Sequence, residues 1–513
     1  MPNETAPHGP APSPAPAPQD TAPAPQDTSP AAQRTAPHDP VLCGLARNPA
    51  LSPALLRRLL RHRTARGRAA HERTDLTAET AEAVLASGDD WAAYCLAANR
   101  HAPAEARSRL VRGADALVRT VLAGRPEDLT ADEAALLAED PSAEVRKALA
   151  AADGTPGPLR AGLAADPDPA VRAELARWWT DAPEEVRRRL LTDEAAEVRA
   201  AACAVNAPRP PRPVPPADLH GALLADPVTR AGVVAHLRLD EALAERLAAD
   251  PDEEVRAALA EHPALPAAVR DALAADPAPD VRVRVFLRED TPQALRAAVH
   301  TGLTAGAAEG AGGAFAVTEE GLSCEIALAA LRFTLVPWVR ADPLPYAASP
   351  YVCFRRSAAA ARDLPPGARE SLLDDPDALV RHTAAAAAPV LSPEAAERAE
   401  RRHRRGGETR GGPADHAVFP AGTLRRFAGD PDARIRVLAL RDPELPAALV
   451  ARLAADDETP VRRAAASHPA LPVPALLALV TDGEEDPEVR EEAAASPVLP
   501  VSDMADLLTL ARL

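Results

Sequence analysis

The sequence is poor in aromatic residues, which make up 3% of its 513 residues. A single large core normally relies on Phe, Tyr and Trp, whereas thin layers of two helices can be filled with Ala, Leu and Val. The low aromatic content therefore favours a short unit that is repeated along the chain over one large globular core.

Lysine is also scarce, since Lys147 is the only one beside many arginines, and 75 acidic residues against 58 basic ones give a formal net charge of −17 at pH 7. Proteins that bind nucleic acids need clustered positive charge to neutralise phosphates. The charge balance argues against a nucleic acid as the main partner, and it gives no support for docking on an anionic membrane.

Clustered cysteines and long apolar runs are missing as well. The five cysteines are scattered without a CxxC pair, which indicates reduced thiols and no metal or cofactor site. The most apolar stretch, about 322–339, contains Glu325 and Arg332 and is broken by Pro337, so it is a poor membrane span. With no signal peptide visible at the N-terminus, we expect a cytoplasmic protein.

Residues 1–38 are rich in Pro and Ala and contain a duplicated APAPQDT, without apolar periodicity. Such a segment cannot bury enough apolar surface to offset the entropy of ordering. We expect a disordered, partly polyproline-like tail, with a role as a proline-rich ligand as the less favoured alternative.

One phrase recurs after this tail: Asp-Pro, three variable residues, then Val-Arg or Ile-Arg, as in Asp140-Pro141 followed by Val145-Arg146. Within the regular stretches the interval is 26 to 28 residues. The Val or Ile positions are Val118, Val145, Val171, Val198, Val255, Val281, Val380, Ile435, Val461 and Val489. We expect each of these apolar residues to lie in the core.

A second phrase, such as His262-Pro-Ala-Leu-Pro, lies half a period away and leads into Leu-rich segments with helical spacing. Each unit therefore reads as two helices. Asp followed by Pro is typical of a helix start, and Glu253 after Asp250 predicts a capping box.

The Asp and the Arg of the first phrase are six residues apart, which places them far apart around one helix. They are better placed to pair with the adjacent unit, as Asp140 and Arg146 would with Arg172 and Asp166. The alternative is a binding groove lined by arginine. We favour the ladder of ion pairs between units.

The Asp-Pro...Val-Arg phrase resembles HEAT repeats, and its alternation with Asn/His-Pro-Ala-Leu-Pro resembles the leucine-rich repeat variant family. The short period fits the second family better, because HEAT units run to about 40 residues. This resemblance covers most of residues 40–513 and implies an all-α, right-handed solenoid of α- and 3₁₀-helices. The family is also associated with an iron–sulfur domain built on clustered cysteines, which are missing here, so no cofactor is carried over.

Three segments interrupt the repeat. Residues 208–217 form a proline-rich connector, and a basic loop of about 401–415 could contact phosphate, although a surface loop is favoured. The third, residues 298–352, gathers aromatics and arginines of the kind that anchor interfaces. Either it binds a partner or it packs on the array as a small satellite core. The candidate partner-binding residues are Phe333, Trp338, Arg340, Tyr346, Tyr351 and Arg355.

The predicted organisation is therefore a tail (1–38), a helical repeat array (39–297), the aromatic insertion (298–352) and a second array (353–513). We expect a non-enzymatic scaffold that binds a protein or peptide, because repeat arrays offer extended surfaces. The alternatives are a nucleic-acid-binding or DNA-repair-like protein, and a regulatory appendage of a neighbouring enzyme.

Overall fold

A computed structural model describes residues 40–204, 213–310, 319–388, 391–402, 412–483 and 485–513. Within these ranges every regular element is an α- or 3₁₀-helix, so the prediction of an all-α chain is confirmed for them. The predicted tail lies outside the described residues, as do 205–212 of the connector region, 311–318 of the insertion and 403–411 of the basic loop.

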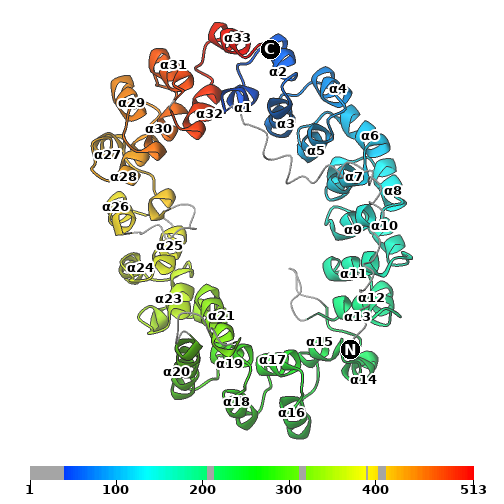
Figure 1. Ribbon diagram of the computed structural model, residues 1–513. Helices are drawn as coiled ribbons and strands as arrows, with labels where there is room; N and C mark the ends of the chain where they lie inside the picture. Colours follow the sequence, from blue (N-terminus) through cyan, green and yellow to red (C-terminus); the bar gives the residue numbers. More distant parts are fainter. Residues whose placement is uncertain (1–39, 205–212, 311–318, 389–390, 403–411, 484) are drawn as a thin grey trace, which may run out of the picture. The chain divides into compact units, whose positions relative to one another are not determined.

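The first set of helices, which we call the first row, includes every helix that carries the Val-Arg phrase, and most of its members contact the next one, whereas α25 contacts η5 (Figure 1). Its members are α1 (Pro40–Arg47), α3 (Arg63–Glu72), α5 (Asp90–Ala98), α7 (Ala116–Ala123), α9 (Ala143–Ala151), α11 (Pro169–Trp178), α13 (Ala196–Ala202), α15 (Arg230–Val234), α17 (Glu253–Glu261), α19 (Pro279–Leu287), α21 (Glu319–Phe333), α23 (Val352–Ala359), α25 (Ala378–Ala386), α28 (Ala433–Ala439), α30 (Thr459–Ala466) and α32 (Pro487–Ala495).

The remaining helices lie between these along the chain. They are α2 (Pro53–Leu59), α4 (Ala78–Ala86), α6 (Ala104–Gly113), α8 (Ala131–Ala138), α10 (Gly157–Leu163), α12 (Glu184–Leu191), α14 (His220–Ala225), α16 (Glu241–Ala248), α18 (Ala267–Leu273), α20 (Gln293–Gly310), α22 (Pro337–Ala341), α24 (Pro366–Leu373), α26 (Pro393–Arg402), α27 (Ala421–Phe427), α29 (Ala447–Ala454), α31 (Val473–Thr481) and α33 (Val501–Leu510). The 3₁₀-helices are η2 (Pro126–Asp128), η3 (Ala217–Leu219), η4 (Leu344–Tyr346) and η5 (Pro413–His416).

The recurring Val or Ile of the phrase forms the centre of the core. Val145, Val171, Val255 and Ile435 each expose 0% of their surface, as predicted. Small alanines fill most of the remaining space between first-row helices, which explains how the chain packs with so few aromatics.

The first-row helices begin two residues later than the sequence predicts, as α17 illustrates. Asp252, not Asp250, caps this helix, with its carboxylate accepting the backbone N–H of Glu254 at 2.9 Å. The predicted capping box between Asp250 and Glu253 is therefore wrong. Asp250 instead accepts the backbone N–H of Asp252 at 3.0 Å and the guanidinium of Arg230 at 2.8 Å.

The predicted ladder of ion pairs between units is present. Arg146 donates Nε and Nη2 to the Asp166 carboxylate at 2.7 and 3.0 Å, and Nη1 to the carbonyl of Asp140 at 2.7 Å. Asp140 accepts from Arg119 and not from Arg172, so that detail of the prediction is wrong. Further rungs join Arg172 to Asp193, Arg199 to Asp226, Arg256 to Asp276, Arg355 to Asp375 and Arg436 to Asp456.

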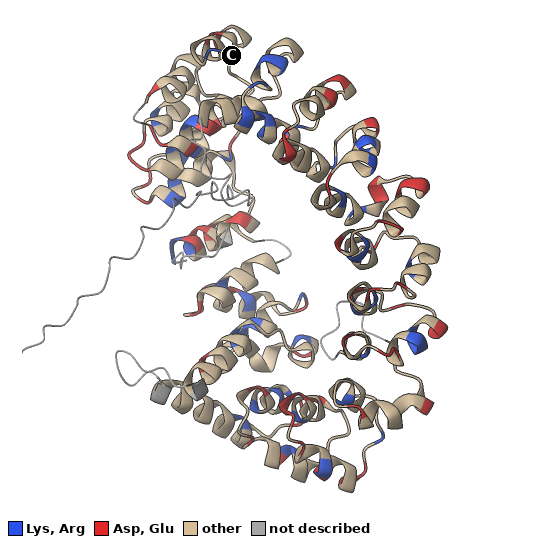
Figure 2. Cartoon of the chain, turned by 45° about the vertical axis from the view of Figure 1, so that its right-hand side comes forward, with Lys and Arg blue, Asp and Glu red and all other residues tan. Residues whose placement is uncertain are grey.

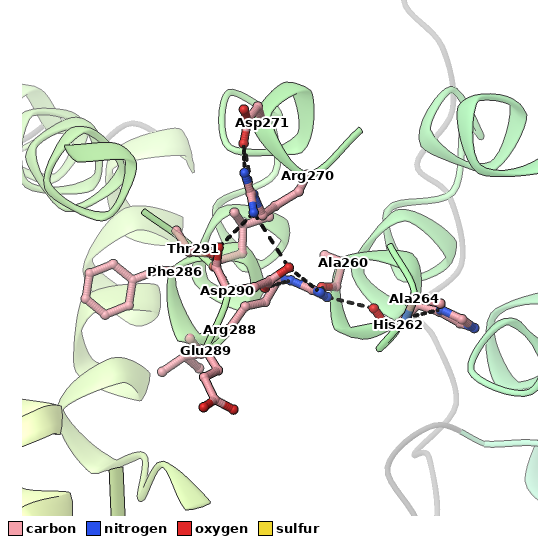
Figure 3. A network of polar contacts seen from close by, with 12 residues as sticks. Ala260, His262, Ala264, Arg270, Asp271, Phe286, Arg288, Glu289, Asp290 and Thr291 are labelled. Atoms are coloured by element: carbon pink, nitrogen blue, oxygen red, sulfur yellow. Dashed lines mark hydrogen bonds and ion pairs between the residues drawn. The ribbon is translucent and has the colours of Figure 1, made fainter. Parts of the chain in front are cut away.

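The polar residue of the second phrase ties each unit to the preceding one. Asn99 donates Nδ2 to the carbonyls of Ala70 and Arg73 at 2.9 and 2.8 Å. Arg288 plays a similar part, donating to the carbonyls of Ala260 and His262 at 2.8 Å each (Figure 3). These bonds satisfy main-chain acceptors that a helix end leaves without partners.

His262 makes the same tie with an imidazole. Its Nε2 bonds the Leu237 carbonyl at 3.1 Å, and its Nδ1 accepts the N–H of Ala264 at 3.1 Å, which requires the neutral ring. Burial, helped by the nearby Arg288 cation, lowers the pKa of His262 below its ordinary value. A proton on Nδ1 would break the bond from Ala264.

We therefore expect the free energy of unfolding to decrease as the pH is lowered below about 6.5, because only the unfolded chain takes up this proton there. The decrease should be up to about 1.4 kcal/mol per pH unit. His262→Asn should keep the tie, as Asn99 does, and weaken this pH dependence. Urea unfolding at about pH 7.5 and 5.5 measures the effect. The exposed His101→Asn is the control, and equal pH slopes in wild type and His262→Asn would contradict the expectation.

The first-row contacts also join the two ends of the described chain. Helix α1 packs against α32, and α2 contacts α33, all within the unit Pro40–Leu513 (Figure 1). Apolar residues of both ends belong to one continuous core cluster, with Leu42 and Leu45 on one side and Val489 and Ala493 on the other. Following the contacts from helix to helix therefore leads back from α32 to α1.

Candidate functional site

Helices α20 and α21 form the largest departure from the repeat. Helix α20 runs through position 298, so the predicted start of the insertion lies inside a helix. The two helices pack closely: a Cβ added at Gly306 would lie 2.8 Å from Sγ of Cys324. Leu303 and Cys324 are fully buried at this contact.

Helix α21 buries one face and leaves an apolar face in solvent. Cys324, Ala327 and Leu331 are buried, whereas Leu322, Ile326 and Phe333 expose 48%, 61% and 61% of their surface. Together with the exposed Ala329, these residues follow the spacing of one helix face, and we call Leu322, Ile326, Ala329 and Phe333 the α21 stripe. A contiguous exposed apolar stripe of this kind is typical of an interaction surface, whereas single exposed apolar residues are common on any protein surface.

The stripe lies in the segment Gly321–Ala341, which by length and composition alone could cross a membrane, with a mean hydropathy of 1.5 and 28% of it buried. The segment is not one continuous helix, because α21 ends at Phe333 and α22 begins at Pro337. Arg332 within it pairs with Asp377 at 2.9 Å. These features are weak evidence for a membrane span.

A cluster of aromatic rings lies next to this hairpin. The ring of Phe354 lies 5.4 Å from Phe286, 5.6 Å from Tyr351, 5.3 Å from Trp338 and 5.7 Å from Tyr346. Phe286 and Phe354 are fully buried or nearly so. The rings therefore form a small core beneath the insertion.

Arg296 covers this cluster with its guanidinium 5.2 Å from the Trp338 ring and 5.3 Å from the Phe354 ring, while it donates Nε to the Phe286 carbonyl at 3.0 Å. Burial raises the pKa of Tyr351, and it raises the pKa of Cys353 to about 12. Both groups therefore stay protonated at neutral pH, which disfavours Cys353 as a nucleophile.

The structure separates the six residues predicted from the sequence into two exposed and four packed side chains. Phe333 and Arg340 are exposed, and Phe333 belongs to the α21 stripe. Trp338 donates Nε1 to the Leu287 carbonyl at 2.8 Å.

The other three predicted residues are also engaged within the fold. The rings of Tyr346 and Trp338 lie 5.2 Å apart, and Tyr351 is 8% exposed. Arg355 forms a ladder rung with Asp375 at 2.7 Å. Leu322 and Ile326 were missed; their helical spacing with Phe333 places the three on one face, but it does not show that this face is exposed.

The two adjacent tryptophans do not form a joint stacking surface. Trp179 is buried, with Arg160 5.6 Å from its ring, whereas Trp178 is 41% exposed and donates Nε1 to Glu174 at 2.7 Å. Acidic and basic residues are interspersed over the helices (Figure 2). Among the described residues, no group of three or more His, Cys, Asp or Glu side chains could hold a metal ion.

The comparisons with known proteins give no family for this chain. No protein-family model matches the sequence, and the search of curated proteins returns no significant match.

Proposed function

We propose that the chain is a non-enzymatic scaffold, a right-handed α-solenoid of about 26-residue two-helix repeats that binds a protein or peptide. The α21 stripe carries this proposal. Apolar anchors such as Ile326 and Phe333 supply interface energy when a partner covers them. The fitting partner is an amphipathic helix, or a groove in a folded protein, that accepts apolar side chains at helical spacing.

The polar residues of the two repeated phrases support the same function indirectly, because their structural roles leave the α21 stripe as the candidate binding surface. Asp and Arg of the first phrase are engaged in the ladder, and Asn and His of the second phrase bond the preceding unit. These residues hold the array together and need no ligand to explain their presence. The five cysteines are buried and scattered, which fits the reduced environment of the cytoplasm.

Replacing Ile326 and Phe333 together by Asp should abolish partner capture, because charged side chains would be desolvated in the interface. We expect the dissociation constant of a protein captured from cytoplasmic extract and then purified to rise at least about tenfold. Both side chains are exposed, so the thermal unfolding midpoint should stay near that of wild type.

Val418→Asp is the matched control, since Val418 is a large exposed apolar residue outside the stripe. Unchanged affinity of the double variant would remove the stripe from the proposal. Selective capture of duplex DNA at low salt by the wild type would favour the nucleic-acid alternative, and flotation with anionic vesicles would favour a membrane surface.

A further inference from the structure

The contact between the first and last units is a close one. A Cβ added at Gly44 of α1 would lie 2.2 Å from the carbonyl oxygen of Glu491 and 2.7 Å from Cβ of Ala494, both in α32. The backbone of α1 at Gly44 therefore lies directly against α32, with no room for a side chain at that position. We call this contact the seam, with an N-edge formed by α1 and α3 and a C-edge formed by α32.

The seam repeats the hydrogen bonds of an internal junction. Asn48 donates Nδ2 to the carbonyls of Ala494 and Ser496 at 3.0 and 2.7 Å, and its Oδ1 accepts the N–H of Ala50 at 2.9 Å. Asn99 makes the same two donor bonds to the preceding unit. Asn48 is fully buried, so leaving its amide without partners would be costly.

Charge at the seam is divided between the two edges. Arg47 on the N-edge lies 3.4 Å from Glu491 and 3.3 Å from Glu492, and Arg68 bonds Glu491 at 2.8 Å. Both arginines belong to the N-edge, where they also pair with Glu72 of α3 at 3.7 and 2.8 Å, and Glu491 and Glu492 belong to the C-edge. The edges are therefore complementary in shape, in hydrogen bonding and in charge.

The seam differs from the internal junctions in one respect, since its paired residues are more than 420 positions apart and no short connection ties them. Opening it breaks one junction and leaves the nearest-neighbour contacts of the other units intact. Each edge then offers a surface that fits the opposite edge of any copy of the chain.

We propose that the seam is an exchangeable interface whose second partner is another copy of this chain, bound N-edge to C-edge. Closure within one chain prevails at ordinary concentration, because the tethered edges meet at an effective concentration in the millimolar range. When closure is disfavoured, two copies join by the same contacts, as in domain swapping. This inference does not depend on the proposed partner of the α21 stripe.

Two charge-reversed forms of the full chain test it. The N-edge variant carries Arg47→Glu and Arg68→Glu, and the C-edge variant carries Glu491→Arg and Glu492→Arg. In each variant alone, like charges face one another both within the chain and between copies. When the two are mixed, every N-edge meets a C-edge of opposite charge.

Light scattering coupled to gel filtration gives the readout. We expect each variant alone to elute at the chain mass of 53.6 kDa and the equimolar mixture to contain a complex of twice that mass. A chain with all four changes should return to the monomer with the hydrodynamic radius of wild type, because opposite charges then meet within one chain.

Two controls separate the seam from general charge attraction. Adding Gly44→Leu to both edge variants should abolish the complex, since a side chain at either N-edge collides with the Glu491 carbonyl of the opposite copy. Mixing Arg57→Glu with Glu79→Arg, which reverses an exposed pair joining α2 to α4, should give no complex. The proposal is wrong if the edge variants stay monomeric when mixed, or if Gly44→Leu leaves the complex intact.

Discussion

Replacing Gly232 by Ala should push α15 away from the end of α13. A Cβ at this position would lie 1.4 Å from the carbonyl oxygen of Cys203 and 2.6 Å from its carbonyl carbon, so the obstacle is backbone and cannot rotate away. Overpacking usually costs about 1–3 kcal/mol, and we expect a loss at the top of this range or above it, since two helices must move apart.

The form of the unfolding curve should change as well. In a repeat array, stability depends on contacts between neighbouring units, so the units beside a broken junction should unfold before the rest of the array. We expect the urea unfolding of Gly232→Ala, followed by circular dichroism, to show a new transition at lower urea. Gly221→Ala is the control, because a Cβ there meets nothing within 4 Å and alanine favours the helix. A single wild-type transition for Gly232→Ala would contradict the close approach.

Removing the acid from a buried ladder rung should have the second large effect. Arg172 and Asp193 are joined by two bonds of 2.8 Å, and their side chains are 9% and 7% exposed. The Arg172 guanidinium lowers the pKa of Asp193, so the carboxylate stays ionised at neutral pH. In Asp193→Ala the guanidinium remains buried without its partner, and we expect a loss of about 3 kcal/mol.

Replacing both partners tests whether the effect comes from the orphaned charge. Arg172→Met with Asp193→Leu removes the ion pair but leaves apolar groups that can pack, so most of the stability should return. The exposed pair Arg188–Asp218 is also joined by two bonds of 2.8 Å, through Nη1 and Nη2, and Asp218→Ala should produce no measurable change. Equal losses for Asp193→Ala and the double variant would show that packing, and not unpaired charge, sets the effect.

The positions of the first-row helices could be predicted because the same phrase recurs, so that an uncertain assignment in one unit is supported by the other units. Val145 and Val171 mark the same structural position one period apart, and each new copy strengthens the assignment. The helix starts could not be predicted to the residue. Asp250 and Asp252 are equally good caps by sequence, and the choice is made by Arg230, an ion-pair partner 20 residues away.

Which face of α21 is exposed could not be predicted from the sequence either. Its segment is apolar on several sides, with Leu322 and Ile326 in solvent and Leu331 in the core, so periodicity alone does not tell the faces apart. The seam could not be predicted from the sequence because its residues resemble those of the internal junctions. Asn48 at the seam begins the same Pro-Ala-Leu phrase as His262 and His468 within the array.

The ladder gives the array a direction, since each arginine of a rung reaches forward to an acid in the following unit, while Arg282, Arg381 and Arg490 of the same phrase bond other groups. Arg146 bonds Asp166, and Arg172 in turn bonds Asp193. If one whole period were lost or duplicated, every arginine of a rung would still find an acid ahead of it, wherever within the period the cut fell. An insertion or deletion of any other length would leave a buried arginine or aspartate of the ladder without its ion-pair partner. The chain can therefore grow or shorten by whole units with little penalty, while insertions of other lengths are tolerated mainly where no rung is crossed.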